Sequence, residues 1–167
     1  MNAMPYHEAA EHHAAAHMRA LGYRDARATK RGSDGGLDVV ANGAVAQVKT
    51  HVKTVGAPDL QRLYGARGVH HHRKMLFYSL SGYSPKAVAY AQTAEIMLFR
   101  LELDGSATPE NENARKLVKL AASTAAAQNA SDSMTSARQE AARRIAAQTP
   151  AAKAEYERRN AAERASW

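Results

Sequence analysis

The sequence predicts an α/β fold, in which a mixed β-sheet is flanked by helices and followed by an Ala-rich α-helical C-terminal extension. Before Gly105, short Val-, Leu- and Phe-rich runs alternate with amphipathic stretches. An Asn-Gly pair between two Val/Ala-rich runs is typical of a tight hairpin. Beyond Gly105, large apolar residues become sparse and Ala, Arg, Glu and Lys dominate. We therefore expect a sheet domain at residues 1–105 and a helical tail at residues 106–167.

Composition restricts the classes of partner. The 167 residues carry a formal net charge of +7, which favours a polyanionic partner, and nucleic acid is the first candidate. The chain has no cysteine, so it has neither a disulfide framework nor a thiolate metal site. No apolar run approaches the roughly 20 residues of a membrane-spanning helix, and the N-terminus has no secretory pattern. We expect a soluble, cytoplasmic protein with no membrane contact.

The first elements follow from periodicity. The spacing predicts a helix from Pro5 to Ala20, ended by Gly22, and a strand from Tyr23 to Thr29. The glycine-rich connection then leads into a hairpin of two strands around Asn42-Gly43. The apolar face of the first helix is formed by Ala10, Ala14, Met18 and Leu21.

The second half of the sheet domain alternates helix and strand. We expect a helix from Pro58 to Gly68, a strand from Arg73 to Leu80 and a helix that Ser84 caps and that runs through Thr93. A last strand covers Glu95 to Leu103. The predicted order, α-β-β-β-α-β-α-β, gives a mixed sheet with helices on its faces.

The tail has helical composition without a core of its own. We predict helices at Pro109 to Gln128, Ser133 to Gln148 and Pro150 to Ala165, with a break at Asn129 to Asp132. An Ala-rich chain is helical with little burial. Two interpretations stay open: a solvated helical surface, or an arm that contacts DNA or a second copy of the chain.

The hairpin brings polar side chains together. A type I′ turn at Asn42-Gly43, with positive φ at both residues, places Asp38 opposite Gln47. Side chains directly opposite each other are about 5 Å apart at Cβ. Lys49, two residues beyond Gln47, shares the same face. A carboxylate, an amide and an ammonium therefore converge on an otherwise apolar hairpin.

These residue types suit metal-assisted hydrolysis of a phosphodiester. We expect Asp38, the amide oxygen of Gln47 and the carbonyl of Val48 to bind Mg²⁺, with Mn²⁺ as the alternative. Lys49 would orient the attacking water or stabilise negative charge at phosphorus. Glu11 lies about 80° from the centre of the apolar face of the first helix and Glu8 about 140° away, so Glu11 is the better candidate to assist.

Basic residues around the hairpin are candidate contacts to nucleic acid. The run from His70 to Lys74 is interpreted either as compensation of the preceding helix dipole or as part of a phosphate-binding rim. Gln61 has an alternative interpretation as an ordinary helix residue. The candidate nucleic-acid contacts are Lys30, Arg31, Lys53, Gln61, Arg73 and Lys74.

Other chemistries find little support. His13 and His17 have the i, i+4 spacing of a transition-metal pair, but no carboxylate pattern completes that site. No Gly-x-Ser-x-Gly elbow is present, and the Gly32 to Gly36 turn lacks a phosphate-loop lysine. We expect no small-molecule cofactor.

The stretch from Tyr6 through Gly105 resembles the Mrr-like restriction endonuclease domain of the PD-(D/E)xK nuclease superfamily. The resemblance depends on the order and spacing of short motifs rather than on any one of them. These motifs are Glu11, Gly22-Tyr23, Asp34-Gly35-Gly36-Leu37-Asp38, Gln47-Val48-Lys49, Gln61, Gly65, Ser81-Gly82-Tyr83-Ser84, Ala87, Tyr90 and Ala91.

The resemblance implies a restriction-endonuclease-like catalytic domain that cleaves DNA with a metal ion. Asp38, Gln47 and Lys49 would form the catalytic core, assisted by Glu11. The wider superfamily mostly has a carboxylate where this chain has Gln47, whereas the Mrr-like branch has Gln. Two alternatives remain: a non-catalytic nucleic-acid-binding protein that retains the nuclease fold, and a helical interaction protein. A homodimer is a further hypothesis, because one active site cuts one strand.

Overall fold

The computed structural model describes residues 5–29, 36–148 and 150–165. The predicted nucleic-acid contacts Lys30 and Arg31 lie outside these residues. By their contacts, the residues divide into two compact units, Met1–Ala122 and Ser123–Trp167.

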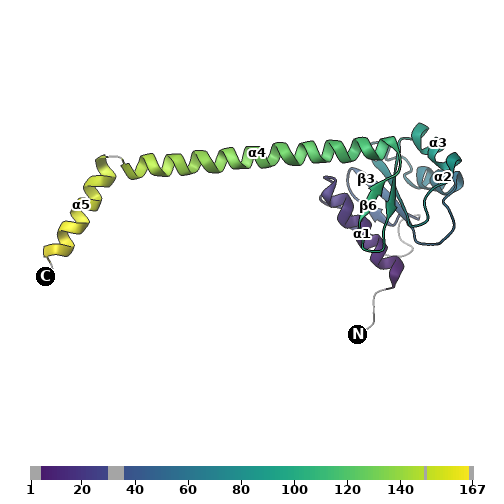
Figure 1. Cartoon of the computed structure of the whole chain (residues 1–167), viewed down its shortest axis with the longest axis horizontal. Helices are drawn as coiled ribbons and strands as arrows, with labels where there is room; N and C mark the ends of the chain where they lie inside the picture. The colour runs from purple at the N-terminus through teal and green to yellow at the C-terminus, as the bar shows by residue number, and fades with distance from the viewer. Residues whose placement is uncertain (1–4, 30–35, 149, 166–167) are drawn as a thin grey trace. The chain divides into compact units, whose positions relative to one another are not determined.

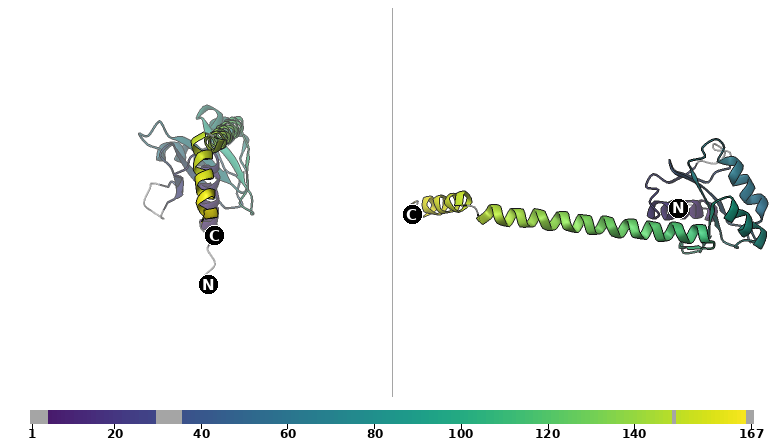
Figure 2. Two further views of the ribbon diagram at one scale, coloured as in Figure 1. Left: turned by 90° about the vertical axis from the view of Figure 1, so that its left-hand side faces the viewer. Right: turned by 90° about the horizontal axis from the view of Figure 1, so that it is seen from above.

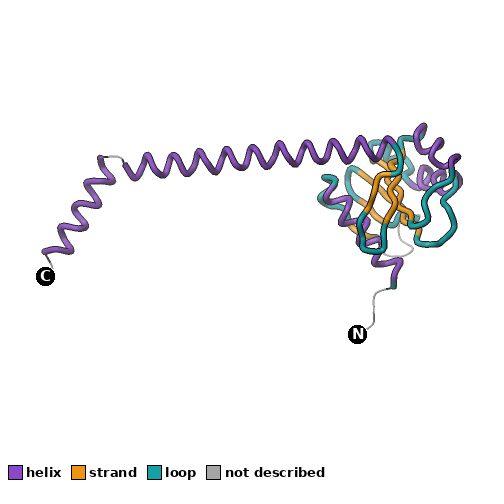
Figure 3. Tube along the Cα trace, viewed as in Figure 1, coloured by secondary structure: helices purple, strands orange, loops and turns teal. Residues whose placement is uncertain are grey.

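The first unit is built around a six-stranded sheet with the strands in chain order, drawn in orange in Figure 3. The three central strands, β3, β4 and β5, are parallel, and the remaining pairs are antiparallel. A mixed sheet was expected, and the structure confirms it. The strands are β1 (Arg27–Ala28), β2 (Val39–Val40), β3 (Ala44–Lys49), β4 (Lys74–Ser79), β5 (Ile96–Leu101) and β6 (Ala107–Pro109).

Helices cover both faces of this sheet (Figures 1 and 2). On one face, α1 (Tyr6–Ala20) packs its small residues against Val39, Ala46 and Val48. On the other face, α2 (Ala57–Ala66) and α3 (Pro85–Thr93) pack against the face of β3 that carries Val45. The predicted α/β class, with helices on the faces of the sheet, is confirmed.

Coverage of both faces explains why β4 and β5 are apolar along most of their length. Neighbouring residues of β4 belong to opposite cores, with Phe77 on the α2 and α3 side and Tyr78 on the α1 side. Both side chains are fully buried. Parallel strands that are buried on both faces are apolar at successive positions and show no alternation.

The hairpin has the predicted register but not the predicted turn. Val39 pairs with Ala46 and Val40 with Val45, and the Ala41 amide donates to the Ala44 carbonyl at 2.8 Å, which leaves Asn42 and Gly43 as a two-residue loop. The type I′ assignment is wrong, because neither Asn42 nor Gly43 is among the described residues with positive φ. External contacts hold the loop instead: the Asn42 amide donates to Asp25 Oδ2 at 2.8 Å, and the Gly43 carbonyl accepts from the Lys74 amide at 2.9 Å.

The other predicted boundaries agree with the structure at the start of α3 and differ from it at β1 and at the end of α2. As predicted, Ser84 caps α3 by accepting from the Ala87 amide at 3.2 Å. The strand predicted from Tyr23 to Thr29 contains only the two residues of β1. The interpretation of the His70 to Lys74 run as dipole compensation for α2 is wrong, because α2 ends at Ala66 with no basic residue in its last turn.

The connection from the sheet to the C-terminal helices was not foreseen. Pro109 ends β6 and does not begin a helix, and α4 (Glu112–Gln148) begins after Asn111. The predicted break at Asn129 to Asp132 is also wrong, because α4 runs through it. The polar side chains of this stretch are exposed and leave no buried group unpaired, and the Ser133 hydroxyl donates to the Asn129 carbonyl at 2.8 Å within the continuous helix.

The first unit includes the beginning of α4. Ala114 is buried in the core on the α1 side, and Leu117 and Val118 pack against it. The functional boundary predicted at residues 105/106 stays a prediction. No helix of the described residues is both long enough and apolar enough to cross a membrane.

The second unit consists of the remainder of α4 and of α5 (Pro150–Ala165), whose bounds match the predicted last helix. Residues 123–144 are exposed, and the large apolar side chain Met134 is 60 % exposed. The helical character of the tail is therefore confirmed.

Candidate functional site

Asp38 lies where the β2–β3 ladder becomes irregular. Its amide donates to the Ala46 carbonyl at 3.0 Å, although Ala46 already pairs with Val39. Its carboxylate Oδ2 accepts a hydrogen bond from the Val48 amide at 2.7 Å. Asp38 and Val39 therefore both lie opposite Ala46, which is the arrangement of a β-bulge. The regular pairing of β2 with β3 starts at Val39, so the predicted direct pair of Asp38 with Gln47 is replaced by this contact between Asp38 and Val48.

The end of β3 presents its side chains to alternate faces. Gln47 and Lys49 share the face of Val45, which α2 and α3 cover, whereas Val48 faces α1. The main chain of the even-numbered residues points toward β2, since the Ala44 and Ala46 carbonyls accept hydrogen bonds from the amides of Ala41 and Asp38, which flank that strand. By the same alternation, the Val48 carbonyl points toward the edge at which the Asp38 carboxylate lies.

Gln47 has an unusual environment for an amide side chain. It is 9 % exposed, and among the described residues its Oε1 has no hydrogen-bond partner. Buried polar atoms are normally paired, because an unpaired one costs about 1–3 kcal/mol. An oxygen ligand for a hard cation would be such an atom, so Gln47 Oε1 fits the role predicted for it.

Asp38 and Lys49 interact electrostatically. Burial raises the pKa of the Asp38 carboxyl above its ordinary value, while the Val48 amide and the positive charge of Lys49 oppose that rise. The side chains of Asp38 and Lys49 are both partly buried. The Asp38 carboxylate, the unpartnered Gln47 amide oxygen and the Val48 main-chain carbonyl are oxygen donors of the kind that suit Mg²⁺ or Mn²⁺.

The segment that follows Lys49 is fixed by residues far along the chain. The Leu80 amide donates to the Lys49 carbonyl at 3.2 Å, and the Ser81 hydroxyl donates to the Lys53 carbonyl at 2.7 Å. The Val55 amide donates to the Gly82 carbonyl at 3.0 Å. The Ser81-Gly82-Tyr83-Ser84 motif therefore anchors the loop beyond Lys49.

Comparison with known families decides the identity of this domain. Residues 2–103 match the catalytic domain of the Mrr family, described as restriction endonuclease. The chain belongs to the Mrr restriction endonuclease family. No curated protein and no solved structure matches it. Membership implies a nuclease with DNA as its substrate. The Mrr match contains Asp38, Gln47 and Lys49, and it ends just before the last sheet strand, β6.

Gln47 and Lys49, two of the predicted Mrr catalytic residues, lie on the sheet face that α2 and α3 cover, whereas Glu11 lies on α1. Glu11 is partly buried on α1, the helix that covers the Val48 face of the sheet. Gln47 and Lys49 project from the opposite face. A role for Glu11 in assisting the site stays a prediction.

The predicted nucleic-acid contacts of the Mrr domain do not form one cluster. Lys53 is exposed in the loop just beyond β3, and Gln61 is exposed on α2. Arg73 and Lys74 lie at the opposite end of the parallel strands, because Lys74 pairs with Ala44 and Ser79 with Lys49. Their roles stay predictions.

The histidine pair of α1 is not arranged as a metal site. The imidazole Nδ1 of His17 lies 2.9 Å from the hydroxyl oxygen of Tyr78, to which it is hydrogen-bonded. The His17 ring also packs edge-on against Phe99, with the ring centroids 4.9 Å apart. Within the described residues, no three His, Cys, Asp or Glu side chains are grouped to hold a metal. A cation at the β2–β3 edge would therefore need the amide and main-chain oxygens as well as Asp38.

Proposed function

We propose that this Mrr-family chain is a metal-dependent DNA endonuclease that hydrolyses phosphodiester bonds. The observation that carries the proposal is the buried, unpartnered Oε1 of Gln47, one strand away from the Asp38 carboxylate. A fold alone gains nothing from an unpaired buried amide oxygen. In a site that binds a cation, such an oxygen is free to serve as a metal ligand.

In this proposal Asp38, Gln47 and the Val48 carbonyl hold Mg²⁺ or Mn²⁺. The bound metal would lower the pKa of a water molecule and neutralise charge on the phosphate. The hydrogen bond from the Val48 amide keeps the Asp38 carboxylate at the edge of β3, so the protein holds this ligand in place before substrate arrives.

Lys49 supplies a cation next to the carboxylate. Water adds to phosphorus, one P–O ester bond breaks, and the departing oxygen takes up a proton. Negative charge accumulates on the phosphoryl oxygens during this step, and the Lys49 ammonium stabilises it. Lys49 also orients the attacking water, and Glu11 assists from α1.

The proposed catalytic domain comprises residues 1–105, and the cytoplasm is its proposed location.

Cleavage of supercoiled plasmid tests the proposal. Wild-type protein is incubated with plasmid in Mg²⁺, in Mn²⁺ and in EDTA, beside Asp38→Asn, Lys49→Ala and Lys86→Ala. Lys86 is exposed in the first turn of α3 and serves as the matched control for loss of one lysine. We expect metal-dependent nicking or linearisation by wild type and Lys86→Ala, and a loss of at least 100-fold in the other two variants.

Binding without cleavage would contradict the proposal. If wild type and all variants are equally inert with either metal but retard DNA in a gel, the chain is a non-catalytic nucleic-acid-binding protein with the nuclease fold. Cleavage that persists in Asp38→Asn would show that the site lies elsewhere. Circular dichroism of each variant establishes that it is folded.

A further inference from the structure

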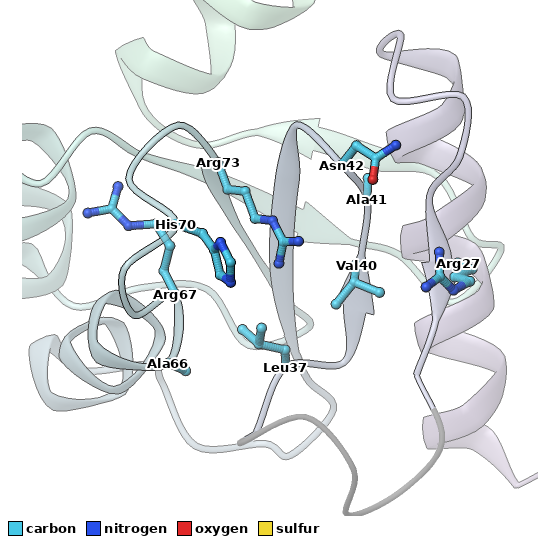
Figure 4. Close-up of a pocket in the computed structure, with 9 residues that line it drawn as sticks. All are labelled: Arg27, Leu37, Val40, Ala41, Asn42, Ala66, Arg67, His70 and Arg73. Atoms are coloured by element: carbon cyan, nitrogen blue, oxygen red, sulfur yellow. The ribbon is translucent and has the colours of Figure 1, made fainter.

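A second polar site lies on the same sheet face as Gln47 and Lys49. It is a pocket of about 330 Å³ between the hairpin, the end of α2 and the loop that leads into β4 (Figure 4). Its floor is apolar and its rim carries an amide and four basic side chains. The lining residues are Arg27, Leu37, Val40, Ala41, Asn42, Ala66, Arg67, His70 and Arg73.

The basic side chains differ in their orientation. In Figure 4, the guanidinium of Arg73 and the imidazole of His70 point into the pocket above the hairpin, while Arg27 lies at the far rim. The guanidinium of Arg67 points away, and it lies over the Tyr64 ring, 4.8 Å from its centroid. Arg73, His70 and Arg27 are therefore the groups that would meet a ligand.

Among the described residues, no carboxylate balances the positive charge of the pocket. No carboxylate lines it among the described residues. Neither Arg27 nor Arg73 forms an ion pair with any described carboxylate, and the buried Nε of Arg73 has no hydrogen-bond partner there. A guanidinium offers a planar fork of donors that matches the oxygens of a phosphate.

The Arg73 end of the pocket lies away from Lys49, whereas Leu37 at its other end is the neighbour of Asp38. Lys74, next to Arg73, pairs with Ala44 at the start of β3, whereas Lys49 ends that strand. Five residues of strand span about 16 Å. The main chain at Arg73 therefore lies about 16 Å along the sheet from the main chain at Lys49.

We propose that this pocket, with Arg73 at its centre and Arg27 and His70 at its sides, binds a phosphate group. As a contact to a substrate strand, it rests on the proposed function. As a site for a free phosphate or mononucleotide, the pocket is independent of the proposed nuclease function. The two sources share one chemistry, a phosphate ester oxygen on a guanidinium.

Binding in EDTA separates this proposal from catalysis. Fluorescence anisotropy with a labelled 20-base-pair duplex is measured for wild type, Arg73→Gln, Arg27→Gln and the control Arg115→Gln. Arg115 is exposed, pairs with Glu112 and lies outside the pocket. We expect Arg73→Gln to weaken binding about tenfold and to lower the slope of log K against log salt by about 1. We expect Arg115→Gln to change affinity less than about twofold.

Competition identifies the source of the phosphate. Inorganic phosphate and dAMP at millimolar concentration are tested by calorimetry against wild type and Arg73→Gln. If wild type binds either probe and Arg73→Gln does not, the pocket is assigned to a free phosphate. If Arg73→Gln weakens duplex binding and neither inorganic phosphate nor dAMP binds wild type, the pocket is assigned to a DNA strand. Exposed Arg27 provides the second variant, should Arg73→Gln unfold.

Two outcomes would overturn the inference. One is equal weakening of duplex binding by Arg73→Gln, Arg27→Gln and Arg115→Gln, which would show general attraction by charge. The other is that neither the duplex nor a small phosphate binds wild type. Failure of the proposed function looks different, because plasmid cleavage would then be absent while binding in EDTA still depended on Arg73.

Discussion

At the residue scale, the proposed metal site would take one of its oxygen ligands from Gln47. A neutral amide contributes an oxygen ligand without charge, so the described part of the site carries one carboxylate, Asp38, next to the cation of Lys49. Affinity for Mg²⁺ is set by the number and charge of its oxygen ligands. A site of this composition should need a high concentration of free metal.

Replacing Gln47 by Glu tests this reasoning with a readout other than cleavage. In EDTA, Gln47→Glu should lower the free energy of unfolding by on the order of 2 kcal/mol, because it buries a second carboxylate beside Asp38. Addition of 10 mM Mg²⁺ should then raise its Tm by more than that of wild type, measured by differential scanning fluorimetry.

Gln61→Glu is the control, since it makes the same substitution at an exposed position of α2. An equal response to Mg²⁺ in Gln47→Glu, Gln61→Glu and wild type would mean that the Gln47 oxygen is not a ligand.

His17 should make stability depend on pH. Burial lowers the pKa of its imidazole below the ordinary value of 6.5. A lowered pKa in the folded state means that the stability contributed is present above about pH 6.5 and is lost as pH falls through the folded-state pKa. His17→Gln retains a polar partner for the Tyr78 hydroxyl and removes the titration.

Urea unfolding at pH 7.5 and at pH 5 measures this effect. Wild type should lose more free energy of unfolding between these pH values than His17→Gln, by up to about 1.4 kcal/mol per pH unit. Identical losses would show that His17 titrates normally in the folded protein.

At the scale of elements, Asn111 joins the sheet to the long helix. It is 2 % exposed, its Oδ1 accepts from the amides of Leu98 and Ala114 at 3.1 and 3.0 Å, and its Nδ2 donates to the Ile96 carbonyl at 2.8 Å. A single side chain thus caps the first turn of α4 and completes the hydrogen bonding of β5.

Asn111→Ala should therefore be strongly destabilising. It leaves buried backbone groups unpaired and removes a helix cap, so we expect a loss of about 3 kcal/mol in urea unfolding. Asn129→Ala, in the exposed middle of α4, should change stability by less than about 0.5 kcal/mol. Similar losses for the two variants would contradict this role of Asn111.

Sequence reasoning succeeds at this scale where local pattern and tertiary contacts agree. Ser84-Pro85 begins α3 as its residues alone suggest, and counting outward from Asn42-Gly43 gives the correct hairpin register. The turn type was missed because Asp25 and Lys74 hold the loop from outside. β6 has three residues and ends in proline, so it has no pattern that could be recognised.

The same limit applies to the site. Asp38, Gln47 and Lys49 are predicted from the sequence because strand periodicity and the family resemblance agree, and their catalytic roles stay predictions. The bulge at Asp38 depends on a side chain that replaces a main-chain partner, which no periodicity reveals. The Arg73 pocket combines β1, the hairpin, α2 and a loop, so only the three-dimensional structure brings Arg27 near His70.

At the scale of the whole molecule, the first unit contains a complete core. Its sheet is covered on both faces by its own helices, and residues 123–144 are exposed. A chain that ends at Ala122 should keep cooperative unfolding, with a Tm within a few degrees of the full chain, because little apolar surface is removed. Calorimetry of both chains checks this, and a broad, non-cooperative transition would contradict it.

The homodimer hypothesis belongs to the same scale. Sedimentation velocity at micromolar concentration should show a dimer of the full chain and a monomer of the chain ending at Ala122, if the tail pairs two copies. A full-length monomer that still cuts both strands of plasmid would refute the hypothesis.

The sheet itself ends in very short strands. The outermost strands, β1 and β6, have two and three residues, and β6 contains a proline, which has no amide to donate. Neither edge offers another chain a row of free backbone groups long enough to continue the ladder. Two copies that meet on one duplex would have to be held together by helices or by the DNA itself, and a crowded solution of this protein should resist stacking into fibrils.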